Sequence, residues 1–338
     1  MHDLKSPYLL FLGFGDNPLA IKTSRGLAQW RPDICIGETG SPLSLGLQKM
    51  TPFEGAQAGA KTFIIGLANS GGKLAADWVV TILEAIDAGL DIASGLHERL
   101  IDNPEIKLAA KKKGVQLHDI RHQIGRLTVG TGTKRSGTRI LTVGTDCSVG
   151  KMYTALAIEQ EMKKRNFNVD FRATGQTGIF IAGGGIPIDA VVSDFISGAV
   201  EQLCPNQETD HWDIIEGQGS LFNPAFAGVS LGLIHGAQPD ILVMCHEANR
   251  ERIKDMAEFP IPDLRDCIDT NLKMARLTNP NVQLGAISLN CRVIGPELAD
   301  QYCAELSQEF SVPCFDPMIH GTKQLVNRLE RNSTSNLR

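Results

Sequence analysis

Short apolar runs alternate with glycine-containing turns along the first half of the chain. Four such runs each lead into a turn with glycine, and they lie at residues 8–12, 34–36, 62–67 and 91–94. Between the last two runs, a spacing of i, i+3, i+4 and i+7 puts apolar side chains on one helical face, at Val79, Ile82, Leu83 and Ile86. Strand, turn, helix and strand in repetition predict a parallel sheet covered by helices. We therefore expect a Rossmann-like α/β domain over residues 1–134.

The second half repeats this alternation with longer strands of the buried type. Its apolar runs predict strands at residues 140–143, 169–173, 213–216, 241–247 and 284–290. A second α/β domain is expected over residues 135–331, with a last helix over about residues 323–331 and a flexible polar tail over residues 332–338. The stretch from Gly125 to Thr138 is rich in Gly, Thr, Arg and Lys, which predicts a linker or hinge loop between the halves.

The most informative segment lies where the first strand of the second half ends. Residues 140–152 read Ile-Leu-Thr-Val-Gly-Thr-Asp-Cys-Ser-Val-Gly-Lys-Met, and a helical pattern follows to residue 165. A strand, a turn with glycine and lysine, and a helix in this order form a phosphate-binding P-loop. We expect Lys151 to lie exposed on this loop as a mobile positive charge. The predicted phosphate contacts are Gly144, Thr145, Cys147, Ser148, Val149, Gly150, Lys151, Met152 and Tyr153.

Two departures from the common P-loop pattern bear on metal chemistry. Gly144 lies one residue further from Gly150 than in G-x-x-x-x-G-K-[ST], and Met152 occupies the position of the Mg²⁺-binding hydroxyl. The phosphate cradle is kept while the usual metal ligand is lost. This combination favours binding a pyrophosphate over hydrolysing MgATP, so we expect no required metal.

Composition narrows the class of protein. The 338 residues suffice for two domains, and 42% hydrophobic with 21% charged residues is typical of a soluble globular protein. A net charge of -5 argues against nucleic-acid binding, which needs a basic face. No apolar run reaches the ~18 residues of a membrane span. Eight scattered cysteines without C-x-x-C and a start without signal-peptide features indicate the cytoplasm. We also expect a homo-oligomer.

Two charged clusters have simple structural interpretations. Lys111 to Lys113 precede Gly114, which is the pattern of a helix end. His118 and His122 have the spacing of two metal ligands on one helix, but no third ligand stands near them in the sequence. We therefore expect both histidines to be surface residues.

Several motifs resemble known families. The spacing Gly144-Thr145-Asp146-x-x-Val149-Gly150-Lys151 and the turn Glu216-Gly217-x-Gly219 resemble the dethiobiotin synthetases, which implies a P-loop NTPase-type domain with a mostly parallel sheet. A resemblance over nearly the whole chain is to the D-glutamate N-acetyltransferases, long known only as a domain of unknown function. It rests on five segments in the same order: residues 118–121, 144–152, 174–178, 216–221 and 236–240. This resemblance implies acetyl-CoA as donor and the α-amino group of D-glutamate as acceptor.

The chemistry of acetyl transfer points to candidate catalytic residues. An amine that attacks a thioester must lose a proton, and the tetrahedral oxyanion must be stabilised. Asp146 and Glu216 stand at strand-end turns, where either is a candidate base, or both are Mg²⁺ ligands if a metal is present. His246, at the end of a predicted strand, is preferred over His235 as an alternative base, although each can also be a purely structural histidine.

The acceptor's carboxylates call for a cation, and bidentate arginine is the natural partner. Arg172, just before the turn of residues 174–178, is the first candidate and Arg121 the second, with ion pairing as the alternative for both. Gln176 and Thr177 in that turn complete the predicted acceptor contacts. Cys147, at a helix N-terminus, has two interpretations: an acyl-carrying thiolate or, as we prefer, a small side chain that fits a tight loop.

Three classes of function follow. The leading one is an acetyl-CoA-dependent N-acetyltransferase for an acidic amino acid, most of all D-glutamate. The runner-up is an ATP-dependent ligase or kinase of the dethiobiotin synthetase type, which would require Mg²⁺. The third is a nucleotide-sensing module without catalysis.

Overall fold

The chain consists of two compact units. The computed structural model describes residues 4–18, 20–67, 72–122 and 125–335. Contacts group residues 1–126 with 175–190 in the first unit, and residues 127–174 with 191–338 in the second. The sequence suggested a division at residues 134 and 135 and counted residues 175–190 with the second half. In the structure that segment carries helix α6 (Gln176–Ala182), which packs on α1 (Lys22–Trp30) of the first unit.

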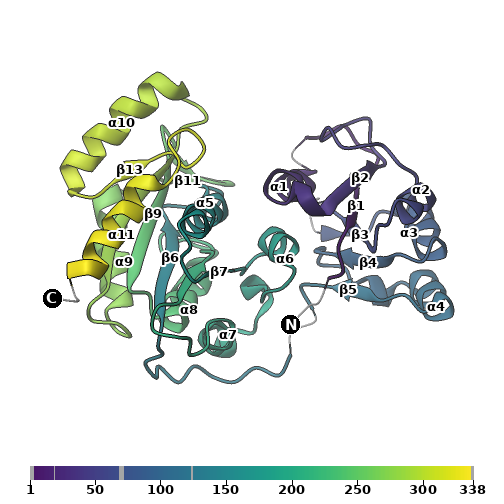
Figure 1. Cartoon of the computed structure of the whole chain (residues 1–338), viewed down its shortest axis with the longest axis horizontal. Coiled ribbons are helices and arrows are strands. Elements are labelled where there is room, and N and C mark those ends of the chain that lie inside the picture. Colours follow the sequence, from purple (N-terminus) through teal and green to yellow (C-terminus); the bar gives the residue numbers. More distant parts are fainter. Residues whose placement is uncertain (1–3, 19, 68–71, 123–124, 336–338) are drawn as a thin grey trace. The chain divides into compact units, whose positions relative to one another are not determined.

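The first unit is built on a five-stranded sheet with the order β2-β1-β3-β4-β5, in which every pair is parallel (Figure 1). Its strands are β1 (Tyr8–Phe11), β2 (Cys35–Thr39), β3 (Thr62–Ile65), β4 (Asp91–Ser94) and β5 (Leu117–Asp119). Strands β1, β3 and β4 are buried at every position, which is typical of a parallel sheet covered on both faces. The expected Rossmann-like parallel sheet is confirmed.

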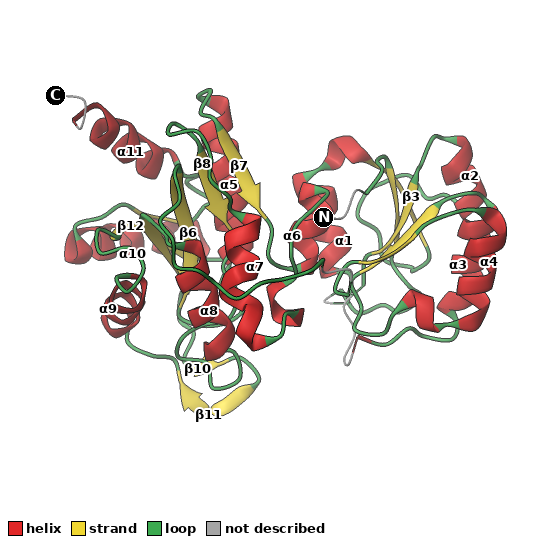
Figure 2. Ribbon diagram, turned by 90° about the horizontal axis from the view of Figure 1, so that it is seen from below, coloured by secondary structure: helices red, strands yellow, loops and turns green. Residues whose placement is uncertain are grey.

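Helices cover both faces of this sheet. In both ribbon views α2 (Pro52–Gln57), α3 (Trp78–Asp87) and α4 (Pro104–Lys113) lie on one side, and α1 with α6 on the other (Figure 2). Helix α4 begins at the Asn103 cap, whose side chain accepts from two backbone N–H groups, and ends at Gly114 in the left-handed conformation with φ 78°. The lysines before Gly114 therefore end a helix, as their pattern indicated.

The second unit contains a six-stranded parallel sheet with the order β13-β12-β9-β6-β8-β7. The strands are β6 (Thr138–Gly144), β7 (Val169–Arg172), β8 (Trp212–Ile215), β9 (Ile241–Glu247), β12 (Gln283–Asn290) and β13 (Cys314–Phe315). A separate antiparallel hairpin is formed by β10 (Arg252–Ile253) and β11 (Met256–Pro260). Strand β6, which leads into the P-loop, lies between β8 and β9, so loops from both neighbours reach the same edge.

Two layers of helices enclose this second sheet. The helices are α5 (Lys151–Lys164), α7 (Ile196–Leu203), α8 (Ala227–Ala237), α9 (Leu264–Ala275), α10 (Gly295–Phe310) and α11 (Lys323–Ser335). Figure 2 shows α5 and α11 on one side and α8 and α9 on the other. The core between α5, α11 and the sheet is apolar and fully buried, with Ile158, Met162, Val243, Phe315 and Leu325 among its members. This packing fixes the start of α5, and with it the P-loop.

Three local expectations had different outcomes. Residues 125–137 contain no helix or strand and join the two units, as expected of a linker or hinge loop, but Arg135 within them is buried and donates to the carbonyl oxygens of Glu201 and Cys204 within the second unit. His122 is exposed as expected, whereas His118 lies on strand β5 and is half-buried. Helix α11 continues through Ser335, four residues into the expected tail, and residues 336–338 lie outside the described chain.

Candidate active site

The turn between β6 and α5 has the backbone of an anion-binding cradle. Ser148 and Gly150 both have positive φ, 58° and 105°, and Gly150 caps the helix that starts at Lys151. The backbone N–H groups of Cys147 to Gly150 donate to no acceptor among the described residues. Consecutive free N–H groups at a helix N-terminus form a concave positive surface. The predicted phosphate contacts thus share one loop, and their role in binding stays a prediction.

Lys151 lies beneath this loop and is not exposed, so that part of the sequence-based picture was wrong. Its side chain is 7% exposed, and its Nζ donates to the carbonyl oxygen of Asp146 at 2.7 Å. The side chain passes so close to Gly217 that a Cβ there would lie 3.0 Å from Lys151 Cδ, and only 1.7 Å from the oxygen of Thr142. Burial lowers the pKa of Lys151, while the nearby Asp146 and Glu216 oppose this shift. Glycine at 217 is therefore needed first of all by the close approach of the Thr142 backbone, and the lysine side chain packs against the same glycine.

Asp146 joins the P-loop to two other segments. Its carboxylate is fully buried and accepts from Asn223 Nδ2 at 3.0 Å, Arg250 Nη1 at 3.0 Å and the Lys254 backbone N–H at 2.7 Å. Arg250 also donates to the Cys147 carbonyl at 2.8 Å and pairs with Glu247. Three donors occupy the carboxylate oxygens. The arrangement suits a positioning carboxylate better than a base that must meet substrate.

Glu216 is likewise bonded inside the fold. The residue is 4% exposed, and its Oε2 accepts from the Thr174 backbone N–H at 2.9 Å. The Thr174 hydroxyl in turn donates to the Glu216 carbonyl at 2.7 Å and accepts from Gln218 Nε2 at 3.1 Å. These bonds tie the end of β8 to the end of β7. Glu216 therefore supports the floor of the site beside Lys151.

His246 is the candidate base with the most available ring nitrogen. It lies at the end of β9, next to the P-loop strand, and its Nδ1 is 3.0 Å from Thr145 Oγ1. Burial, with a smaller contribution from Arg250, lowers the pKa of His246 to about 4. The imidazole is consequently neutral near pH 7 and keeps a lone pair on one nitrogen. The Nε2 atom has no hydrogen-bond partner among the described residues.

The surroundings of the P-loop bear on two questions: whether Cys147 carries an acyl group, and whether a hydroxyl replaces the metal ligand missing at Met152. Burial raises the pKa of the Cys147 thiol, although Lys151 opposes the shift. A raised pKa is the opposite of what an acyl-carrying thiolate requires, which favours the interpretation as a small loop residue. The first aliphatic hydroxyl after Met152 on the helix, Thr154 Oγ1, bonds to the Gly150 carbonyl at 3.0 Å and to Ser288 at 2.7 Å. Within the described part of the chain, no group of three or more His, Cys, Asp or Glu residues could hold a metal ion.

The two candidate arginines lie in different units. Arg172, in the second unit, pairs with Asp213 at 2.6 Å and Asp170 at 3.2 Å. Arg121, in the first unit, is 8% exposed, donates to the Gly95 carbonyl at 2.7 Å and pairs with Asp189. Each guanidinium thus already has a carboxylate.

Gln176 and Thr177 belong to the first unit with Arg121. Thr177 Oγ1 lies 3.2 Å from Thr23 Oγ1, which joins α6 to α1. Within the described residues, the buried amide oxygen of Gln176 has no hydrogen-bond partner, and it lies so close to Gly95 that a Cβ there would be 2.1 Å away. Gln176 and Arg121 therefore meet at the same glycine. Of the predicted acceptor contacts in the described chain, Gln176 Oε1 and Arg172 Nη2 are buried polar atoms without a hydrogen bond, although Arg172 Nη2 lies 3.2 Å from Asp170 in an ion pair.

Sequence reasoning missed the basic hairpin beside the P-loop. Arg250 and the Lys254 backbone hold Asp146, and Lys254 Nζ donates to Ser148 Oγ at 3.1 Å. Arg250, Arg252 and Lys254 recur at every second residue, which is the spacing of one face of a strand. That alternation was the available signal. Asn223 lies far from the P-loop in the sequence, on the loop before α8, and no sequence pattern pointed to it.

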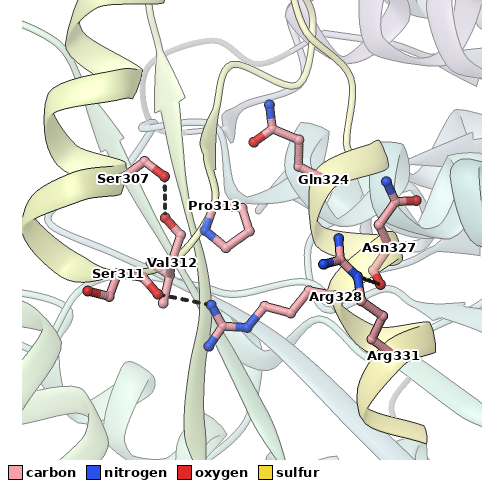
Figure 3. Close-up of a pocket in the computed structure, with 8 residues that line it drawn as sticks. All are labelled: Ser307, Ser311, Val312, Pro313, Gln324, Asn327, Arg328 and Arg331. Carbon is pink, nitrogen blue, oxygen red and sulfur yellow. Dashed lines mark hydrogen bonds between the residues drawn. The ribbon is translucent and has the colours of Figure 1, made fainter. Parts of the chain in front are cut away.

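Other pockets of the second unit lie away from the P-loop. One of about 520 Å³ lies between the end of α10, the start of β13 and α11 (Figure 3). Arg328 reaches across it to donate to the Ser311 carbonyl at 3.1 Å, and the Arg331 guanidinium bends back to Asn327. These residues precede β13 or lie on α11, whereas the P-loop follows the carboxyl end of β6. The pocket is therefore separate from the candidate active site.

Comparison with known proteins identifies the family to which this chain belongs. Residues 128–326 match the family described as the domain of unknown function DUF1611_C, a P-loop domain. Residues 36–123 match DUF1611_N, a Rossmann-like domain. The chain belongs to the DUF1611 family. A crystal structure of a DUF1611 family protein from Anabaena variabilis matches with a TM-score of 0.86 at 28% identity, over 97% of this chain and 100% of that one.

Two curated relatives of this DUF1611 protein carry a functional name. A D-glutamate N-acetyltransferase from a Pseudoalteromonas species is 50% identical over 329 residues, which is 96% of this chain and 99% of the relative. A D-glutamate N-acetyltransferase from Tritonibacter scottomollicae is 44% identical over the same shares of both chains. The P-loop and Rossmann-like domains expected from the sequence are thus confirmed, and so is the family resemblance.

Proposed function

We propose that this protein transfers the acetyl group of acetyl-CoA to the α-amino group of D-glutamate. The observation that carries the proposal is the full-length similarity to two proteins named for this reaction. The P-loop geometry is compatible with it, because coenzyme A carries a pyrophosphate. In the cradle, the N–H groups of Cys147 to Gly150 face that pyrophosphate, and Lys151 and Lys254 supply positive charge.

The reaction needs a proton acceptor beside the donor thioester. The amine nitrogen forms a bond to the acetyl carbon, the C–S bond breaks, and the nitrogen loses a proton. His246 is our candidate acceptor because its imidazole is neutral and one ring nitrogen is unused. Donation from Nδ1–H to Thr145 Oγ1 would leave the Nε2 lone pair for the proton. With a pKa of about 4 the ring is a weak base, which suits an amine that turns acidic once it has attacked the carbonyl.

The acidic residues then have supporting roles. Asp146 holds Arg250 and the Lys254 backbone against the loop, and Glu216 holds Thr174. Acceptor recognition is assigned to Gln176, whose amide oxygen is unused, with Arg121 beside it at Gly95. A substrate carboxylate that binds Arg121 would have to displace Asp189, whose side chain is partly exposed, from their ion pair.

A direct test measures thiol release from acetyl-CoA by the purified protein with D-glutamate, with L-glutamate as the matched control. We expect release with D-glutamate and at least about tenfold less with L-glutamate, since a stereospecific site loses contacts to the mirror image. Mass spectrometry must then show N-acetylglutamate. Thiol release that does not depend on any amino acid would contradict the proposal.

The ATP-dependent ligase or kinase is not favoured by the relatives' names. Titration calorimetry separates the two functions: acetyl-CoA should bind without metal, and ATP with Mg²⁺ should bind more weakly. Tighter binding of MgATP would restore the alternative.

We also propose where the reaction takes place and with which partners. All eight cysteines are free, which supports a reducing compartment such as the cytoplasm. No helix in the described residues is long and apolar enough to cross a membrane. We retain the expectations of a homo-oligomer and of no nucleic-acid partner. Light scattering of the purified protein at several concentrations tests the first.

A further inference from the structure

A cluster of thiols lies in the second unit, away from the P-loop. Cys303 is on α10, Cys314 begins β13, and α10 packs against β13. Both line a pocket of about 460 Å³, together with Asp300, His320 and Gln324. Ser307 and Gln324 also line the neighbouring pocket of Figure 3. A small solute that enters this pocket meets both sulfur atoms.

Polar groups surround the Cys303 sulfur. His320 Nδ1 lies 3.9 Å from Cys303 Sγ, and His320 Nε2 lies 2.9 Å from Asp300 Oδ1. The Asp316 backbone N–H donates to His320 Nδ1 at 2.9 Å, so the imidazole carries its proton on Nε2. Because the Nδ1 lone pair is already used, His320 cannot take the Cys303 proton as a hydrolase base would. The arrangement therefore places an imidazole beside the thiol without forming a catalytic triad.

Cys303 differs from the other cysteines in its acidity. The interaction with the Cys314 thiol lowers the pKa of Cys303, whereas the same interaction raises the pKa of Cys314. Burial raises the pKa of every other cysteine, to about 12 for Cys204 and Cys267 and about 11 for Cys245. One sulfur of the pair is thus suited to attack and the other to hold a proton.

We propose that Cys303 and Cys314 form a peroxide-reactive dithiol that closes to a disulfide between α10 and β13. The Cys303 thiolate attacks a peroxide oxygen: an S–O bond forms, the O–O bond breaks and hydroxide leaves, so that sulfur is oxidised to a sulfenic acid and peroxide is reduced. The Cys314 thiol then attacks that sulfur. The S–S bond forms, the S–O bond breaks, and the hydroxyl leaves as water with the Cys314 proton.

The test uses the folded full-length protein and hydrogen peroxide. After exposure, free thiols are blocked under non-reducing conditions and the peptides are mapped by mass spectrometry. We expect a Cys303–Cys314 cross-link with the loss of two hydrogens in mass, reversed by dithiothreitol. Cys267→Ser, which removes a buried thiol elsewhere in the same unit, should form the cross-link like the wild type.

Variants separate the roles of the two sulfurs. Cys314→Ser should stop at a sulfenic acid on Cys303 that a dimedone probe captures, and Cys303→Ser should show neither product. A cross-link between Cys303 and Cys291 would overturn the assignment of the partner. Preferential oxidation of another cysteine in the folded wild type, or no oxidation of Cys303 at all, would overturn the site itself.

Discussion

The ammonium nitrogen of Lys151 lies 2.7 Å from the carbonyl oxygen of Asp146, so the cation of the P-loop is held by the backbone of that loop. The side chain of the same Asp146 accepts from Arg250 and from the Lys254 backbone. One residue therefore fixes both the lysine beneath the loop and the basic hairpin beside it. Charge and backbone are arranged before any phosphate arrives.

Replacing Lys151 by alanine should weaken donor binding by at least about tenfold, because charge-assisted contacts to phosphate contribute ~1.5–3 kcal/mol. Since the lysine is buried beside Asp146 and Glu216, some stability should be lost as well. Titration with acetyl-CoA measures the first effect and denaturant unfolding the second. Lys163→Ala, on the exposed face of the same helix, is the control and should change neither. A folded Lys151→Ala protein with unchanged donor affinity would refute the role.

The locations of the elements could be read from the sequence because hydrophobic burial follows local spacing. Strands β4 and β9 have the predicted bounds, and β6 with α5 appears where the glycine turn required it. The sequence could not predict that residues 175–190 belong to the first unit, because this depends on which helix α6 packs against. Nor could the burial of Lys151 be predicted, because its side chain packs against Gly217, which is distant in the sequence. Side-chain partners across the fold leave no local periodicity.

Chelation should not abolish acetyl transfer. Met152 offers a thioether where Mg²⁺ needs a hard oxygen, and the Asp146 carboxylate already accepts from three donors. The rate of thiol release is compared in EDTA, in buffer alone and after addition of Mg²⁺, and the three rates should agree within about twofold. Activity that EDTA removes and Mg²⁺ restores would make Asp146 and Glu216 metal ligands.

Arg172→Ala should act on stability more than on recognition of D-glutamate. The guanidinium is paired with the buried Asp213, whose remaining partners are His211 at 3.2 Å and Arg139 at 4.0 Å. Breaking such a pair should lower the free energy of unfolding by on the order of 3 kcal/mol. Arg121→Ala provides the comparison, because it should raise the KM for D-glutamate. If instead Arg172→Ala is stable and its KM for D-glutamate rises tenfold, Arg172 is the substrate arginine.

The pH dependence of stability should report the neutral imidazole of His246. Its pKa is about 4 in the folded protein against an ordinary value of 6.5. Above pH 6.5 both states are neutral at this group, so it adds no dependence. As pH falls from 6.5 towards 4 the unfolded chain takes up a proton that the folded protein does not, so the free energy of unfolding should fall, by about 2 kcal/mol between pH 7 and pH 5. Urea unfolding at the two pH values measures this. His246→Gln cannot titrate and should lose correspondingly less stability over the same interval. Equal losses in both proteins would mean that His246 titrates normally, and that it is not held neutral beside Thr145.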